Sequence, residues 1–195
     1  MGFIFISEKY KHTSFQRMIL QFLRILFIPQ NVRLIFKNNH DLNLFLNQRV
    51  INKDQAFLIR GSGVDIHLFE SVPEPTGLPV VLLPSRMLRD KGVVEFVEAA
   101  NRVNNKSKIA RFALVGAPDP ENPSSIDASR IKKWVDAGWV EWWGHRHYMP
   151  KVYAQSHIVC LPSYREGLPK VLLEAAASCR AIITSDTVGC RDIVK

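Results

Sequence analysis

The stretch that decides the fold reads PSYREGLPKVLLEA and covers residues 162–175. It follows an apolar run at residues 157–161 and continues into a second apolar run at residues 171–177. Pro169 suits the first turn of a helix, because the N–H that proline lacks would have no intrahelical partner there. The pattern therefore predicts a buried strand, a short loop and a helix in direct succession.

Two carboxylates in this stretch are separated by seven residues. Glu166 lies in the loop before the expected helix, and Glu174 lies about two turns along it. A helix N-terminus presents unpaired N–H groups and a partial positive charge, which suits a phosphate. Carboxylates can accept hydrogen bonds from sugar hydroxyls. Together these groups predict a site for a sugar attached to a diphosphate, although a helix with two ordinary surface glutamates would show the same spacing.

The composition describes a globular protein with an uneven charge. The 195 residues are 47% apolar, which is enough to bury a substantial core. Residues 1–60 hold nine Lys or Arg and three Asp or Glu, whereas residues 61–195 hold seventeen and fifteen. A basic segment favours an anionic partner, either nucleic acid or a lipid surface, unless it is a solvated face. Three cysteines without a C-x-x-C pair fit a reducing compartment, and no His/Cys cluster has metal-ligand spacing.

Strands and helices are predicted to alternate along most of the chain. A stretch rich in Pro and Gly at residues 70–79 predicts a linker and a second unit after it. Alternation of this kind predicts an α/β fold with a doubly wound parallel sheet. In this second unit the expected strands are residues 80–83, 110–115, 140–143, 157–161 and 181–184. The expected helices are residues 91–104, 125–137, 149–155 and 170–179, with a further helix starting at Cys190 or Arg191.

The N-terminal part is predicted to contain a basic amphipathic helix over residues 15–26. Arg17, Gln21 and Arg24 share one face, opposite an apolar face. Such a helix can lie on an anionic membrane surface or pack on its own core, and the run is too short to span a bilayer. Strands are expected at residues 32–36 and 56–59, with a helix between them capped by Asn39 or Asp41.

The loop after the strand at residues 80–83 brings two cations together. Arg86 and Lys91 are five positions apart, so both can reach one diphosphate, the first as a planar fork and the second as a point charge. Ligands of an open parallel sheet bind at the carboxyl ends of its strands, which is where this loop and the loop of Glu166 should meet. A charged surface loop is the alternative.

Two further strand ends carry candidate ligand contacts. Gly116 permits close approach of a ligand to the backbone, although an ordinary turn would also use it. Trp142 could stack on a nucleotide base, but Trp142 and Trp143 must point to opposite faces, so at least one should be core. His145 and His147 are interpreted as loop residues.

The motifs described above resemble those of a known family. Residues 140–192 are similar to the donor-binding domain of retaining glycosyltransferases of family 4, which have the GT-B architecture of two Rossmann-like domains. The pair Glu166 and Glu174 matches that family's glutamates, and residues 85–92 look like its Arg…Lys-Gly diphosphate loop. Residues 59–65 look like the segment that joins its two domains.

The resemblance implies a division of the chain. Residues 78–195 would be a nucleotide-sugar donor-binding domain that lacks its C-terminal end. Residues 1–77 would be a remnant of the N-terminal acceptor domain together with the interdomain linker. The sequence is therefore expected to be a fragment of a GT-B-like protein, truncated at both ends.

The resemblance also implies a role for each site residue. Arg86 and Lys91 would hold the diphosphate and stabilise the departing nucleoside diphosphate. Glu166 would contact the donor sugar near its reacting carbon, and Glu174 would bind the ribose hydroxyls. The backbone N–H groups expected to assist are those of Gly167, Leu168 and Lys170. No metal and no cofactor are implied.

The expected function is transfer of a sugar, with retention, from a UDP- or GDP-sugar to a lipid-linked or saccharide acceptor in surface polysaccharide biosynthesis. The location implied is cytoplasmic, with an anionic inner membrane face as an optional partner. Three alternatives stay open: a non-catalytic nucleotide-sugar-binding fragment that needs a partner, a sugar-nucleotide epimerase of the same architecture, and a nucleic-acid binder. The last predicts salt-dependent binding to random oligonucleotides, and we expect none.

Overall fold

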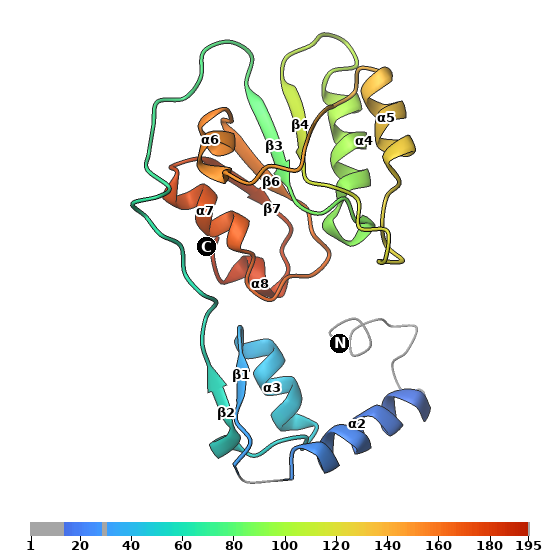
Figure 1. Ribbon diagram of the computed structural model, residues 1–195, viewed down its shortest axis with the longest axis vertical. Coiled ribbons are helices and arrows are strands. Elements are labelled where there is room, and N and C mark those ends of the chain that lie inside the picture. Colours follow the sequence, from blue (N-terminus) through green and yellow to red (C-terminus); the bar gives the residue numbers. More distant parts are fainter. Residues whose placement is uncertain (1–13, 29–30, 195) are drawn as a thin grey trace. The chain divides into compact units, whose positions relative to one another are not determined.

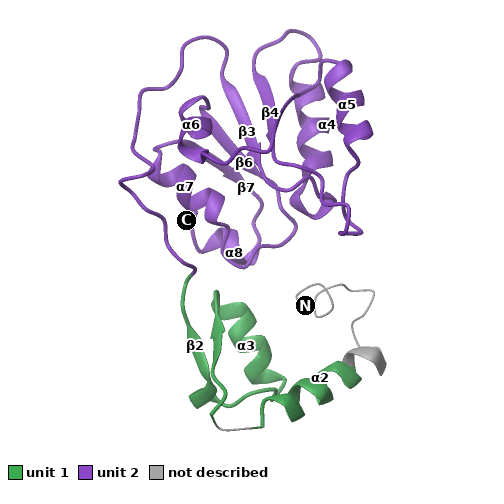
Figure 2. Ribbon diagram, in the orientation of Figure 1, with its two compact units in different colours: residues 1–60 green, residues 61–195 purple. Residues whose placement is uncertain are grey.

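The computed structural model describes residues 14–28 and 31–194, with side chains from Arg17 onward. The chain divides into two compact units, residues 1–60 and residues 61–195, which Figure 2 shows in different colours. The second unit contains two clusters of buried side chains and the first contains one. Each unit therefore has a hydrophobic core of its own.

The second unit is built on a five-stranded parallel sheet with the order β5-β4-β3-β6-β7 (Figure 1). The chain enters in the middle with β3, adds β4 and β5 on one side, and then returns to add β6 and β7 on the other. This confirms the predicted doubly wound fold and places the switch point between β3 and β6. The strands are β3 (Val80–Pro84), β4 (Arg111–Val115), β5 (Glu141–Gly144), β6 (Ile158–Leu161) and β7 (Ala181–Thr184).

Helices cover both faces of this sheet. Two pack on one face and three on the other (Figure 1). Successive side chains of β3 alternate between the two cores: Val81 and Leu83 join the first, and Val80 and Leu82 join the second. A strand buried on both faces reads as a continuous apolar run, which is why its sequence shows no alternation. The helices are α4 (Val93–Val103), α5 (Ala128–Asp136), α6 (Met149–Ala154), α7 (Lys170–Ala177) and α8 (Val188–Arg191).

The helix predicted from Lys91 is divided in two. A short 3₁₀ helix, η3 (Arg89–Lys91), precedes α4, and Gly92 between them has φ +72°. A Cβ on Gly92 would lie 2.1 Å from the carbonyl oxygen of Pro162, so only glycine fits this close approach. Periodicity could not reveal the break, because its cause is a contact with a residue seventy positions away in the sequence. The last helix, α8, begins at Val188, ahead of the predicted start.

The first unit is a small α/β arrangement around four buried apolar residues. Strands β1 (Leu34–Phe36) and β2 (Ala56–Leu58) pair in parallel, and helices α2 (Ser14–Leu26) and α3 (Asn39–Asn47) accompany them, with η2 (Lys53–Gln55) before β2. Asn38 caps α3 by accepting a hydrogen bond from the Asp41 N–H at 2.8 Å, so the prediction of Asn39 or Asp41 as the cap was wrong. The buried apolar residues of this core are Leu23, Phe36, Val50 and Ile51, and Asn38 and Gln55 are buried polar residues of the same unit.

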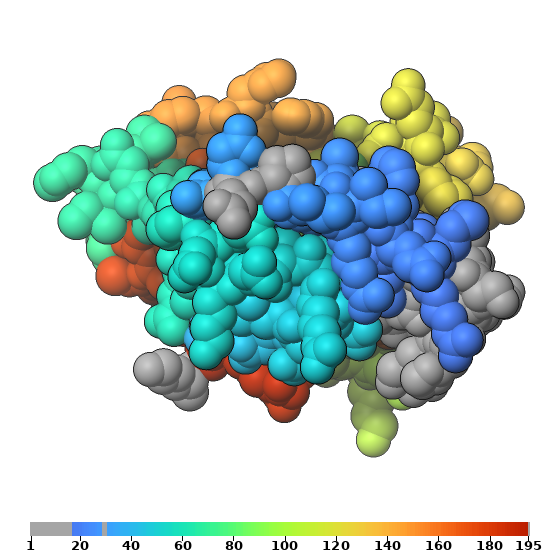
Figure 3. All heavy atoms as spheres, turned by 90° about the horizontal axis from the view of Figure 1, so that it is seen from below, coloured from blue at the N-terminus to red at the C-terminus, as the bar shows by residue number. Residues whose placement is uncertain are grey.

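Helix α2 packs through one stripe and leaves an apolar face open. Leu23 is 3% exposed and belongs to the core of the first unit. Met18, Phe22 and Ile25, one and two turns apart, are 58%, 64% and 67% exposed. Figure 3 shows the blue atoms of α2 at the surface beside the residues that follow in the sequence. Both predicted uses of this helix are therefore compatible with its position.

The segment expected to be a free linker is fastened to the second unit. Phe69 is buried in its core, the Arg180 guanidinium donates to the Val72 carbonyl at 2.9 Å, and His157 Nε2 lies 2.9 Å from the Pro75 carbonyl. These contacts explain why the division of the chain falls after Arg60 and not at residue 77. A composition rich in Pro and Gly marked the segment, but composition does not show what the segment packs against.

Replacing Arg180 should measure the strength of this attachment. Arg180 is 5% exposed, and its guanidinium also donates to the Tyr153 carbonyl at 3.0 Å. Arg180→Ala removes a donor from the carbonyl of the buried Tyr153 and another from the carbonyl of Val72, so we expect a loss of about 3 kcal/mol in the free energy of unfolding, measured by urea denaturation of the full chain. Arg102→Ala, an exposed change on α4, is the control. Equal stability of the two variants would contradict this role.

Candidate functional site

The candidate site lies where the loops after β3 and β6 meet. Strands β3 and β6 are neighbours, and the chain leaves them in opposite directions across the sheet. Parallel strands that diverge in this way open a crevice at their carboxyl ends, where the ligands of doubly wound sheets bind. The loops that border this crevice, residues 85–92 and 162–169, are the two that the sequence singled out.

A partly buried ion pair joins these two loops. Lys91 Nζ lies 2.5 Å from Glu166 Oε1, and their side chains are 23% and 12% exposed. The two residues are 75 positions apart in the sequence, and the switch point of the sheet brings them together. The ammonium group of Lys91 and the carboxylate of Glu166 are therefore direct partners at a place that water reaches only in part. The predicted meeting of the cationic loop with the loop of Glu166 is therefore present.

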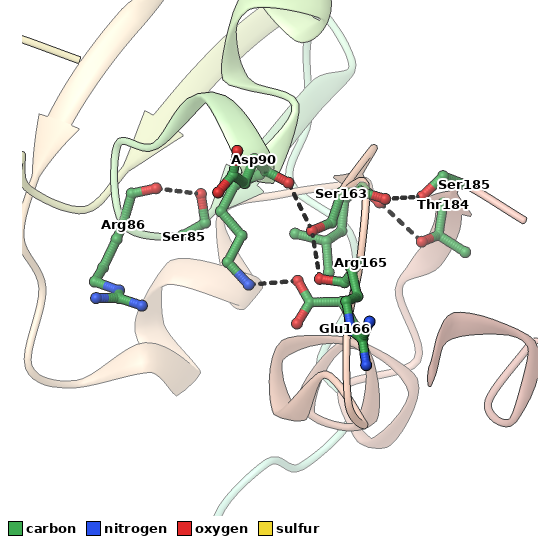
Figure 4. A network of polar contacts seen from close by, with 10 residues as sticks. Ser85, Arg86, Asp90, Ser163, Arg165, Glu166, Thr184 and Ser185 are labelled. Carbon is green, nitrogen blue, oxygen red and sulfur yellow. Dashed lines mark hydrogen bonds and ion pairs between the residues drawn. The ribbon is translucent and has the colours of Figure 1, made fainter. Parts of the chain in front are cut away.

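Backbone contacts fix the geometry of this pair. The Asp90 carbonyl accepts hydrogen bonds from Ser163 Oγ at 3.1 Å and from the Tyr164 N–H at 2.9 Å. Ser185 Oγ donates to the Ser163 carbonyl, which extends the network to the end of β7 (Figure 4). Lys91 and Glu166 are thus held by loops that hydrogen bonds tie to each other.

Arg86 takes a different partner. Its guanidinium lies 2.6 Å from Asp119 Oδ2, in the loop after β4, and its side chain is 61% exposed. Figure 4 shows Arg86 pointing away from Glu166. Each of the two cations predicted to reach one diphosphate is therefore paired with a carboxylate, and Asp119 was not anticipated.

A cleft of about 450 Å³ lies beside Arg86 at the same end of the sheet. It brings together Arg86, Gly116 and Glu174, which the sequence had proposed as site residues. Lys91 and Glu166 do not line this cleft and stand on the adjoining loops. The remaining lining is Pro84, Ser85, Val115, Ala117, Pro118, Asp119, Pro120, His145, Arg146, Met149 and Val171.

Glu174 reaches the cleft from the interior of α7. The residue is 6% exposed, and its Oε2 accepts a hydrogen bond from the Tyr153 hydroxyl at 2.9 Å. Its Oε1 lies 3.6 Å from Lys170 Nζ, one helical turn earlier. Burial, with the Glu174 carboxylate beside it, raises the pKa of Tyr153, so this hydroxyl stays protonated and donates.

Two residues that were predicted to contact the ligand also take part in the packing of the protein itself. A Cβ on Gly116 would lie 1.9 Å from the Ser85 carbonyl oxygen, so the packing of two adjacent loops already demands a glycine there. Trp142 packs against the first core, Trp143 against the second, and Trp142 Nε1 donates to the Gly116 carbonyl at 2.9 Å. Trp142 does not line the cleft, and its role in stacking on a nucleotide base stays a prediction.

The start of α7 also differs in detail from the expectation. Pro169 is the N-cap and Lys170 the first helical residue, so the helix begins one position after the proline. Gly167 already has an interaction partner within the chain. Leu168 lies in the loop before α7 and Lys170 is the first residue of the helix, so the backbone N–H groups of both lie at the edge of the crevice.

Besides Asp119, two polar residues of the cleft were not predicted as site residues. His145 and Arg146 follow β5 directly and line the cleft, although they were interpreted as ordinary loop. Their position at a strand end was the available signal. Among the described residues no group of three His, Cys, Asp or Glu side chains could hold a metal ion. The positive charges at this edge are side chains, chiefly Lys91, Arg86 and Arg146.

Comparison with known proteins agrees with this geometry. The chain is 39% identical over 116 residues to the N,N'-diacetylbacillosaminyl-diphospho-undecaprenol alpha-1,3-N-acetylgalactosaminyltransferase of Campylobacter jejuni, a match that covers 60% of this chain and 29% of that protein. It is 25% identical over its whole length to the UDP-Gal:alpha-D-GlcNAc-diphosphoundecaprenol alpha-1,3-galactosyltransferase of Escherichia coli and spans 52% of it. The chain therefore spans at most about half of these relatives.

Solved structures show the same fold. A glycosyltransferase from Rickettsia africae superposes with a TM-score of 0.74 at 19% identity, covering 90% of this chain and 50% of that one. HepE from Anabaena, solved in complex with UDP, superposes with a TM-score of 0.73 at 18% identity, covering 95% and 52%. Both likenesses support the GT-B-type architecture that the resemblance implied.

The family model described as glycosyl transferases group 1 matches residues 78–195, which include the whole five-stranded sheet and both loops of the ion pair. With its crevice at the switch point and its paired glutamates in place, the chain belongs to the group 1 glycosyl transferases.

Proposed function

We propose that this chain forms the donor-binding part of a glycosyltransferase of family 4, which moves a sugar from a nucleoside-diphosphate sugar to a lipid-linked acceptor with retention. The observation that carries the proposal is the partly buried Lys91–Glu166 pair at the switch point, beside a cleft that contains Glu174. Residues 78–195 act as the donor-binding domain, residues 1–60 belong to the acceptor side, and residues 61–77 are a linker that packs on the donor-binding domain.

The charges of the site suit a departing nucleoside diphosphate. Lys91 and Arg86 supply positive charge next to the crevice, where negative charge develops on the leaving group, and no metal ion is required for this. Both cations are paired with carboxylates of the chain. A diphosphate therefore has to replace Asp119 and Glu166 as their partner. Glu166, once released from Lys91, is free to face the sugar.

The nucleoside end is proposed to occupy the cleft. Glu174 accepts hydrogen bonds from the ribose hydroxyls, and Arg146, also in the lining, is available to the base or the phosphates. The names of the relatives support the substrate classes. Both curated relatives act on diphospho-undecaprenol-linked sugars, one of them from UDP-Gal, and HepE was solved with UDP. We therefore place UDP-sugars before GDP-sugars, and lipid-linked acceptors before free saccharides.

Titration with nucleoside diphosphates tests the assignment. We expect UDP, or else GDP, to bind the full chain in calorimetry, and Lys91→Ala to weaken binding roughly tenfold or more because a charge-assisted contact is lost. Glu166→Gln should bind UDP as tightly as the parent or more tightly, because it removes the anion that competes for Lys91. Lys132→Ala, an exposed change on α5, is the matched control.

Two binding results would contradict the proposal. If UDP, GDP and ADP all fail to bind, or if Lys91→Ala binds like Lys132→Ala, the crevice is not the diphosphate site. Binding without sugar transfer to a diphospho-undecaprenol-linked acceptor would instead favour a donor-binding fragment that depends on a partner.

We also propose that the first unit lies on an anionic membrane surface through α2. None of the helices in the described part of the chain is long and apolar enough to cross a membrane. The exposed apolar face at Met18, Phe22 and Ile25 is flanked by exposed Arg17 and Arg24. This combination suits an interfacial helix at the inner, anionic face of the membrane. A cytoplasmic location also fits the free cysteines among the described residues.

Vesicle sedimentation tests this placement. The parent should sediment with vesicles that contain phosphatidylglycerol and much less with pure phosphatidylcholine, and the binding should weaken as salt is raised. Phe22→Asp should remove most of the binding. Ile109→Asp, which alters a side chain in the second unit that is 57% exposed, should not. Equal binding to both vesicle types, or no effect of Phe22→Asp, would refute the role of α2.

A further inference from the structure

Tyr153 stands behind the cleft and touches its one deeply buried carboxylate. The tyrosine is fully buried on α6 and does not line the cleft, yet its hydroxyl lies 2.9 Å from Glu174 Oε2. The same hydroxyl is 3.3 Å from the Val171 carbonyl, so its single proton is directed mainly at the closer and negatively charged acceptor.

The tyrosine is itself immobilised. Its ring packs edge-to-face against Phe69 with centroids 5.9 Å apart, and its carbonyl accepts hydrogen bonds from Ser156 Oγ at 2.9 Å and Arg180 Nε at 3.0 Å. A side chain fixed at both ends can hold the carboxylate it contacts in one orientation. Glu174 alone, on a chain of three rotatable bonds, has no such restraint.

The two oxygens of Glu174 have competing partners. Oε2 is bound to Tyr153, while Oε1 lies 3.6 Å from Lys170 Nζ, whose side chain is 62% exposed and can pull the carboxylate towards solvent. Without the tyrosine hydroxyl, Oε2 would be buried without this donor, and the carboxylate would gain by turning to Lys170 and water. The hydroxyl therefore opposes the pull of Lys170.

We propose that Tyr153 is the positioning residue of the ribose subsite: its hydroxyl holds one oxygen of Glu174 so that the carboxylate presents a fixed orientation to the ribose hydroxyls. This inference rests on the proposed role of Glu174 in binding ribose. It assigns Tyr153 no contact with the nucleotide, so its effect must pass through Glu174 and must depend on the ribose hydroxyls of the ligand.

The test compares UDP with 2′,3′-dideoxy-UDP in calorimetric titrations of the full chain. Tyr153→Phe removes only the hydroxyl and keeps the ring that packs on Phe69, and thermal denaturation checks that it is folded. We expect Tyr153→Phe to weaken UDP binding about tenfold and dideoxy-UDP binding by about twofold or less. In a Glu174→Ala background, Tyr153→Phe should have no further effect on either ligand.

A matched control removes a similar contact elsewhere. Tyr164 donates to Glu95 Oε1 at 2.7 Å outside the cleft lining, so Glu95→Ala deletes a tyrosine–carboxylate hydrogen bond from its acceptor side and should bind both ligands like the parent. The proposal is overturned if folded Tyr153→Phe binds UDP like the parent, or if it loses affinity equally for both ligands, as a purely structural role would produce. If the parent itself does not prefer UDP to dideoxy-UDP, the ribose role of Glu174 fails, and the inference fails with it.

Discussion

The contact between Lys91 and Glu166 is the constraint on which the rest of the site depends. Both groups are largely removed from water, and at 2.5 Å each supplies the other's missing solvation. Such a pair is stable only if both loops are held in register. The hydrogen bonds from Ser163 and Tyr164 to the Asp90 carbonyl hold the two loops together. Gly92 contributes as well, because a residue without a side chain can lie directly against the backbone of Pro162.

The same contact explains how the cations at this edge of the sheet can pair first with carboxylates of the chain and then with a diphosphate. In the free protein the cations at the crevice are neutralised by carboxylates of the chain. In the proposed complex a diphosphate takes over that task, and Glu166 becomes available where the sugar would lie. Glu174 differs, because it is buried and directed by Tyr153, an uncharged donor, and so keeps its negative charge towards the cleft.

Much of this architecture could be predicted from the sequence. The apolar runs located every strand of the second unit to within about a residue, and the order of strands and helices indicated a doubly wound sheet. Because parallel strands end at a common edge, the polar residues after them were expected to gather there, and Arg86, Gly116 and Glu174 do so.

What escaped prediction consists of contacts between distant segments. Asp119 as the partner of Arg86, and Tyr153 as the partner of Glu174, depend on which side chains face each other across loops and helices. The attachment of residues 61–77 to the second unit has the same origin, since Arg180 reaches Val72 across 108 positions of sequence. Strand parity showed that Trp142 and Trp143 face opposite sides of the sheet, but it could not show that Trp142 packs against the first core.

The central claim is that a nucleoside diphosphate binds at the carboxyl edge of the sheet. The most direct test follows the backbone amide signals of the isotopically labelled chain by NMR as UDP is added. We predict that the largest shifts occur at residues 85–92, 116–119 and 166–174. Shifts concentrated instead around Lys108, Arg111 and Trp139, which line a separate cavity of about 370 Å³ that includes the first residues of β4 and β5, would contradict the account.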